Sequence, residues 1–180
     1  MDLTENQGGY SPTDSYLASY FFDKKPTLWM SSYERRTKET ESVSTFKEVG
    51  GERYLNKSIF ILVSENTFSL AEKFAYGLKH FNKARIIGQT SAGAAHAIDF
   101  MEVNENYLIQ LPISRNIHPV TKIDWEGTGV IPNIITSNNE ALKTAHLKAL
   151  NEQIESLKKQ TIVGPILKRY EKVKTEINNR

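Results

Sequence analysis

The sequence predicts an α/β domain with a partly parallel sheet, followed by C-terminal helices. Two short apolar runs, "SIFILVS" at 58–64 and "ARIIGQ" at 84–89, have the uninterrupted, β-rich character of strands buried on both faces. Between them Leu70, Phe74 and Leu78 recur at helical spacing, which predicts an amphipathic helix. A strand, a helix and a second strand in this order are typical of a parallel crossover unit.

Shorter elements flank this unit on both sides. The segment "SPTDSYLASYFF", 11–22, predicts a short helix behind a proline. The polar stretch that follows contains two β-friendly islands, "TLWMSSY" at 27–33 and "STFKEV" at 44–49, which predict short strands or a hairpin. The segment "IDFMEVNENYLIQLPIS", 98–114, predicts a second hairpin that turns at 104–106.

The last forty or so residues predict helices. Two apolar stripes at helical spacing are separated by Gly164-Pro165, which we expect to interrupt the helix. We therefore divide the chain into a main part, 1–137, and C-terminal helices, 138–180. The stripes can be buried within the chain or against another subunit, so a homo-oligomer formed through these helices is one expectation. They comprise Leu147, Leu150, Ile154 and Leu157, then Ile166, Tyr170, Val173 and Ile177.

Composition excludes several classes of function. The chain has 180 residues, of which 39% are hydrophobic and 24% charged, as in a globular protein. Its net charge of +2 gives no reason to expect a nucleic-acid partner. No cysteine is present, which excludes disulfides and thiolate chemistry. The loop "GQTSAGAAH", 88–96, lacks the G-K-[ST] ending of a phosphate loop, and we expect no metal, no cofactor and no membrane span.

Ser69 lies where the first strand of the crossover unit gives way to the helix. Ser69 to Glu72 reads S-x-x-E before an apolar-periodic segment, which is a capping-box signature. A serine at such a turn also exposes its hydroxyl beside unpaired N–H groups of the helix N-terminus, and these groups stabilise an oxyanion. The spacing alone therefore leaves two interpretations, a helix cap and a nucleophile.

A nucleophilic serine needs a base, and the chain has four histidines. His80 lies roughly 15 Å from Ser69 along the helix at about 1.5 Å per residue. We expect His80 and His146, which lies in the C-terminal helices, to be surface or packing residues. His96 and His118 lie in loops and remain candidates, with no spacing that favours either.

Two further segments have an ordinary and a functional interpretation. In "DLTENQGGYS", Gly8 and Gly9 form either a surface turn or a strand-end loop whose N–H faces a site. In "DWEGTGVIPN", Glu126 is either a solvated turn carboxylate or a carboxylate that orients a base. Neither segment alone decides between the two.

Four segments in a fixed order are more specific than any one of them: "DLTENQGG", "NTFSLAEKFAYGLK", "ARIIGQTSAGAAH" and "DWEGTGVIPNI". Together they resemble the C-terminal processing (tail-specific) serine protease family. Within that family they resemble the branch of tricorn protease and the repeats of interphotoreceptor retinoid-binding protein. That branch shows D-L-R-x-N-x-G-G, T-x-S-x-A-E, G-x-x-x-x-G-G-x-H and W-E-G-x-G-V-x-P-D. The resemblance covers roughly residues 1–150 and implies a ClpP/crotonase-like core that hydrolyses peptide or protein substrates without a cofactor.

The resemblance also implies a role for particular residues. Ser69 matches the nucleophile, and the N–H of Leu70 matches one donor of the oxyanion hole. Gly8 or Gly9 matches the other donor, and the motif does not say which. Glu126 matches the glutamate that orients the catalytic histidine in the tricorn-like branch.

The chain departs from the family pattern at several positions. Ala94 stands where tail-specific members carry a lysine, so their Ser–Lys dyad is absent. Thr4 and Asn133 replace an arginine and an aspartate of the motifs. In the tricorn-like branch the histidine base precedes the D-L-R strand, at which this chain begins. His96 matches a motif histidine that is not the family's base, and we keep it as a substitute base.

These departures give three expectations. The 180 residues form an incomplete catalytic core that is weakly active or inactive alone. The alternative, from a different class, is a non-catalytic ligand-binding or protein-interaction module on the same fold. The compartment is unknown, and a signal peptide in the missing N-terminal region would place the protein in the periplasm or elsewhere outside the cytoplasm.

Overall fold

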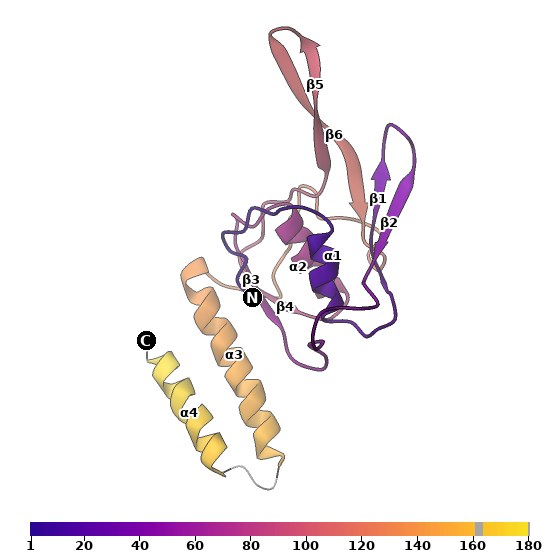
Figure 1. The fold of residues 1–180 in the computed structure, drawn as a ribbon. Helices are drawn as coiled ribbons and strands as arrows, with labels where there is room; N and C mark the ends of the chain where they lie inside the picture. The colour runs from indigo at the N-terminus through magenta and orange to yellow at the C-terminus, as the bar shows by residue number, and fades with distance from the viewer. Residues whose placement is uncertain (161–163, 180) are drawn as a thin grey trace.

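The computed structural model describes residues 1–160 and 164–179. Its core is a three-stranded parallel sheet in the order β3-β4-β7. The strands are β3 (Phe60–Val63), β4 (Arg85–Gly88) and β7 (Ile134–Ile135), and helix α2 (Leu70–His80) connects the first two. The predicted α/β fold with a partly parallel sheet is confirmed (Figure 1).

The two faces of this sheet bury different helices, because successive side chains of a strand point to opposite faces. Ile61 and Ile86 belong to the core that includes Phe74 of α2. Leu62 and Ile87 pack in a second cluster with Ala141 and Ala145 of helix α3 (Asn138–Lys158). Both faces are therefore covered, which explains the uninterrupted apolar runs in the sequence.

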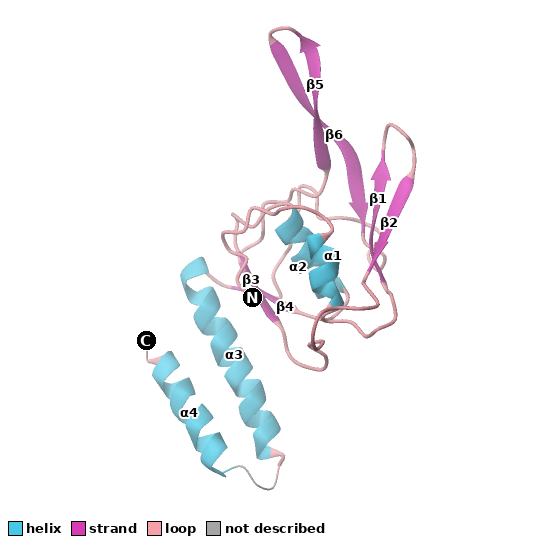
Figure 2. Ribbon diagram, viewed as in Figure 1, coloured by secondary structure: helices cyan, strands magenta, loops and turns pink. Residues whose placement is uncertain are grey.

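A second sheet of four antiparallel strands has the order β2-β1-β6-β5. It contains β1 (Leu28–Glu34), β2 (Thr40–Ser44), β5 (Ala97–Asn104) and β6 (Tyr107–Ile117). The β5–β6 hairpin turns where the sequence predicted and projects away from the rest of the molecule (Figure 2). The strand expected at 44–49 is wrong in position, because β2 ends at Ser44. Its polar, exposed edge position gave no alternating apolar signal.

The remaining helices are α1 (Thr13–Ser19), which packs beside α2, and α4 (Gly164–Asn178), which packs along α3 (Figure 1). Gly164 and Pro165 belong to the first turn of α4 and do not precede it, since proline is tolerated at a helix N-terminus. The division at 137/138 and oligomer formation through the helices stay predictions. No helix in the described part of the chain is long and apolar enough to span a bilayer.

Candidate active site

Ser69 occupies the N-cap position of α2 in an unusual backbone conformation. Its φ of 52° and ψ of −117° differ from the extended conformation typical of an N-cap. A non-glycine residue seldom adopts a positive φ of this kind, and such strain concentrates at functional sites. The Ser69 N–H donates to a carboxylate oxygen of Glu72 at 2.9 Å, as in a capping box. Ser69 therefore caps the helix in a conformation that a cap alone does not require.

The turn that presents Ser69 is tied to two other loops. The Thr67 hydroxyl donates to the Leu3 carbonyl at 2.7 Å, and the Phe68 N–H donates to the Asn6 carbonyl at 3.0 Å. On the other side, the Ala92 N–H donates to the Thr67 carbonyl at 3.1 Å. These bonds bring together the first three of the four motif segments.

Gly8 makes the closest approach to the serine turn. Its φ is +101°, and a Cβ at this position would lie 3.0 Å from both the Leu70 nitrogen and the Ser69 Cβ. The position therefore requires glycine. The Gly8 N–H donates to the Asn6 side chain at 2.9 Å. The N–H groups of Gly9 and Leu70 have no acceptor among the described residues.

Glu72 organises the floor of the site. Its side chain is buried, with 0% exposure. Each of its two carboxylate oxygens accepts two hydrogen bonds. The signature S-x-x-E revealed only the bond to Ser69, because the other donors come from a loop about twenty residues further along the chain. These donors are the Ser91 hydroxyl at 2.6 Å and the N–H groups of Gly93 and Ala94 at 2.7 and 2.9 Å.

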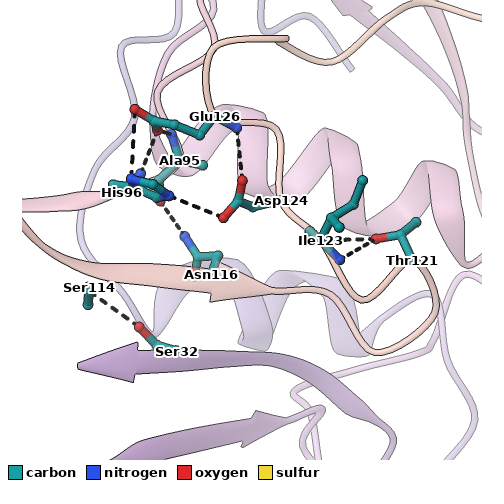
Figure 3. Close-up of polar contacts among 9 residues, drawn as sticks. All are labelled: Ser32, Ala95, His96, Ser114, Asn116, Thr121, Ile123, Asp124 and Glu126. Atoms are coloured by element: carbon teal, nitrogen blue, oxygen red, sulfur yellow. Dashed lines mark hydrogen bonds and ion pairs between the residues drawn. The ribbon is translucent and has the colours of Figure 1, made fainter. Parts of the chain in front are cut away.

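Glu126 also binds this loop, close to where Glu72 binds it (Figure 3). Its Oε2 accepts the N–H groups of Ala95 at 2.7 Å and His96 at 3.0 Å. The His96 Nε2 faces Asp124 Oδ2 at 3.3 Å, and its Nδ1 lies 3.9 Å from Glu126 Oε1. The imidazole therefore lies between two carboxylates. Sequence reasoning missed Asp124, although it stands two positions before Glu126 in "DWEG".

A cleft of about 270 Å³ opens beside Ser69. It is lined by Ser69, Leu70 and His96, together with residues of β1, β2 and β6. Lys73, one helical turn after Ser69, also lines it, but its ammonium is paired with the buried Asp14 at 3.2 Å. Ser69 and the predicted substitute base His96 thus share one cleft, whereas Glu126 acts on the loop that carries His96.

The other histidines are elsewhere. His118 is fully buried and packs edge-on against Tyr76 and Phe81. Burial, reinforced by the neighbouring His80, lowers the pKa of His118 to about 4. His80 packs on Tyr76 with ring centroids 4.2 Å apart, and His146 lies on α3. None of these three lines the Ser69 cleft.

Comparison with known proteins shows the family of the chain and its fold. Residues 1–136 match peptidase family S41. The chain belongs to this family. It is 28% identical over 151 residues to probable CtpA-like serine proteases from strains of Staphylococcus aureus. The match covers 76% of this chain and 30% of the relatives, so the chain spans about a third of their length.

Solved structures of low sequence identity share the fold. The photosystem II D1 C-terminal processing protease is 19% identical with a TM-score of 0.61, covering 76% of this chain and 34% of that one. Mature CPAF is 16% identical with a TM-score of 0.64, covering 84% and 43%. A putative peptidase from Parabacteroides merdae is 15% identical with a TM-score of 0.64, covering 76% and 44%.

Proposed function

We propose that this chain carries the nucleophile and the oxyanion hole of a serine-type peptidase. One observation carries the proposal: the strained Ser69 lies against Gly8, and the N–H groups of Leu70 and of Gly9, the residue after Gly8, have no acceptor within residues 1–160 and 164–179. Donors fixed before the reaction, at the place where negative charge develops, are a large source of catalysis. Gly9 is the better candidate than Gly8, because the Gly8 N–H is already donated to Asn6.

In the proposed reaction, the Ser69 oxygen attacks the carbonyl carbon of a peptide bond while a base removes the hydroxyl proton. The carbonyl oxygen becomes an oxyanion held by the N–H groups of Gly9 and Leu70. The base returns the proton to the leaving amine, which leaves an acyl-enzyme at Ser69. Water, deprotonated by the same base, then releases the acid product.

We assign the principal base to a histidine outside these 180 residues, oriented by Glu126. Both ring nitrogens of His96 face carboxylates, so its ring is not directed to Ser69 alone. The Glu126 side chain is 43% exposed and its Oε1 accepts none of the loop N–H bonds, which leaves this oxygen for a further partner. His96 is the substitute base if no other histidine enters the cleft.

Labelling with a fluorophosphonate tests the nucleophile in the complete natural protein that contains these residues. We expect one adduct on the peptide that contains Ser69, and its loss in Ser69→Ala. Ser32→Ala is the matched control, because Ser32 offers a second hydroxyl in the same cleft. No adduct in the parent, or an adduct that persists in Ser69→Ala, would overturn the assignment and favour a non-catalytic binding module.

Hydrolysis rates test the assignment of the base. Residues 1–180 alone should cleave a peptide about 10⁴- to 10⁶-fold more slowly than the complete protein, because loss of a triad member leaves only binding and the oxyanion hole. Equal rates, abolished by His96→Asn, would instead assign the base to His96.

A further inference from the structure

A second groove, of about 340 Å³, lies on the β1–β6 pair. Tyr33 lies directly opposite Arg115, and the Arg35 N–H donates to the Ile113 carbonyl at 2.9 Å. Since alternate residues of a strand share a face, this register places the side chains of both arginines on one face of the pair. We call this feature the arginine groove, lined by Tyr33, Arg35, His96, Ile113, Arg115 and Ile117.

The charge in the arginine groove is unbalanced. None of the residues that line it is acidic. Within residues 1–160 and 164–179, neither Arg35 nor Arg115 forms a side-chain ion pair. The adjacent Arg36 behaves differently, because its guanidinium pairs with Glu34 at 3.3 Å and with Asp99 at 3.4 Å. The groove therefore offers two guanidinium groups above an apolar floor.

The arginine groove meets the cleft of Ser69 at His96, which lines both spaces. The two spaces lie on opposite faces of the β1–β6 pair, because Ser32 and Asn116 of the cleft alternate along the strands with Tyr33 and Arg115 of the groove. An extended peptide rises about 3.3 Å per residue. A peptide whose scissile bond lies at Ser69 therefore enters the groove by bending past His96, from one face of the strand pair to the other.

We propose that the arginine groove binds an acidic side chain of the peptide substrate and so contributes to its selection. This inference rests on the proposed peptidase function for the identity of the ligand as substrate. Guanidinium groups bind carboxylates through paired hydrogen bonds. The apolar floor of Ile113, Ile117 and Tyr33 suits the methylene groups of a glutamate.

The test uses binding, so that it does not depend on turnover. A ¹⁵N-labelled chain carrying Ser69→Ala is titrated with nine-residue alanine–serine peptides, acetylated and amidated at their ends. One glutamate is moved through the positions, and a glutamine peptide matches each. We expect the best glutamate peptide to bind about tenfold more tightly than its glutamine match, with amide shifts at 33–35 and 113–117. A glutamine peptide with a free C-terminus distinguishes binding of a terminal carboxylate.

Two variants complete the experiment. Arg35→Gln with Arg115→Gln should abolish the preference for glutamate, whereas Arg36→Gln should retain it, because Arg36 is paired outside the groove. Equal affinity for the matched peptides, no binding by either, or a preference retained in the double variant would overturn the inference. A preference for the free C-terminus alone would overturn it as well. Ser69 labelling reports separately on the peptidase proposal, so the two can fail independently.

Discussion

Two glutamates bind the loop that contains Ala94 and His96, and they differ in burial. Glu72 is fully buried and accepts four hydrogen bonds from uncharged donors. Glu126 has a side chain that is 43% exposed, with two N–H donors and an imidazole nearby. A buried carboxylate must keep its hydrogen-bond donors, because a buried polar group without a partner is costly, whereas an exposed carboxylate exchanges its partners with water. The buried Glu72 therefore fixes the geometry of the loop, and the exposed Glu126 is free for chemistry.

The largest effect should follow removal of the buried carboxylate. Glu72→Ala leaves up to four N–H and O–H donors without an acceptor, two of them buried and two part-buried, and each buried group left unpaired costs about 1–3 kcal/mol. We expect a loss of at least about 3 kcal/mol in the free energy of unfolding, measured in urea. Glu155→Ala, at an exposed position of α3, is the control and should change little. A loss below about 1 kcal/mol would contradict the role given to Glu72.

A second buried group, His118, should make stability depend on pH. Its pKa of about 4 in the folded protein lies below the ordinary histidine value of 6.5. Between these values the unfolded chain binds the proton and the folded protein does not, so stability falls as the pH falls from about 6.5 to 4. The full effect is about 3 kcal/mol. Burial lowers the pKa of His80 as well, and the charge of Lys79 adds to this effect. His80 therefore changes stability with pH in the same direction as His118.

Denaturation of His118→Asn across this pH range checks the prediction. The variant should be less stable at neutral pH, because the buried ring no longer packs against Tyr76 and Phe81. Its stability should nevertheless fall less steeply toward pH 4 than that of the parent. A slope unchanged from the parent would show that another group causes the dependence.

A smaller effect is expected where the first loop meets the serine turn. Gly8→Ala places a Cβ 3.0 Å from the Leu70 nitrogen at a φ of +101°, and we expect about 2 kcal/mol of destabilisation with weaker fluorophosphonate labelling. Gly9→Ala is a matched neighbour, because its Cβ would meet nothing within 4 Å. It should keep its stability within about 0.5 kcal/mol. Equal losses of stability in the two variants would show that the close approach of Gly8 to the serine turn is not the cause.

What the sequence could reveal about the site depends on how far apart the interacting residues lie in the chain. Ser69, Glu72 and the crossover strands follow from local patterns, since caps and apolar periods involve neighbours in the chain. The other three donors to Glu72, and the pairing of His96 with Asp124, join residues about twenty to thirty positions apart. Only the tertiary fold brings such residues together.

The arginine groove was out of reach for a related reason. A one-residue change in strand register moves every side chain to the other face, so the face shared by Arg35 and Arg115 depends on how β1 pairs with β6. The sequence predicted the segments that contain these strands but gave no information on their pairing. The position of β2 was missed for a different reason, because its exposed, polar sequence has no alternating apolar signal.

The smallest change in stability should follow removal of the exposed carboxylate. Glu126→Ala frees the N–H groups of Ala95 and His96 where water can replace the acceptor, so the free energy of unfolding should fall by less than about 1 kcal/mol. Labelling of Ser69 in the complete protein should nevertheless drop by more than tenfold, because Glu126 is proposed to orient the base. Glu126→Gln, which keeps an acceptor for the loop, should retain stability and show the same loss of labelling. Labelling that follows stability alone across the two variants would show that Glu126 only holds the loop.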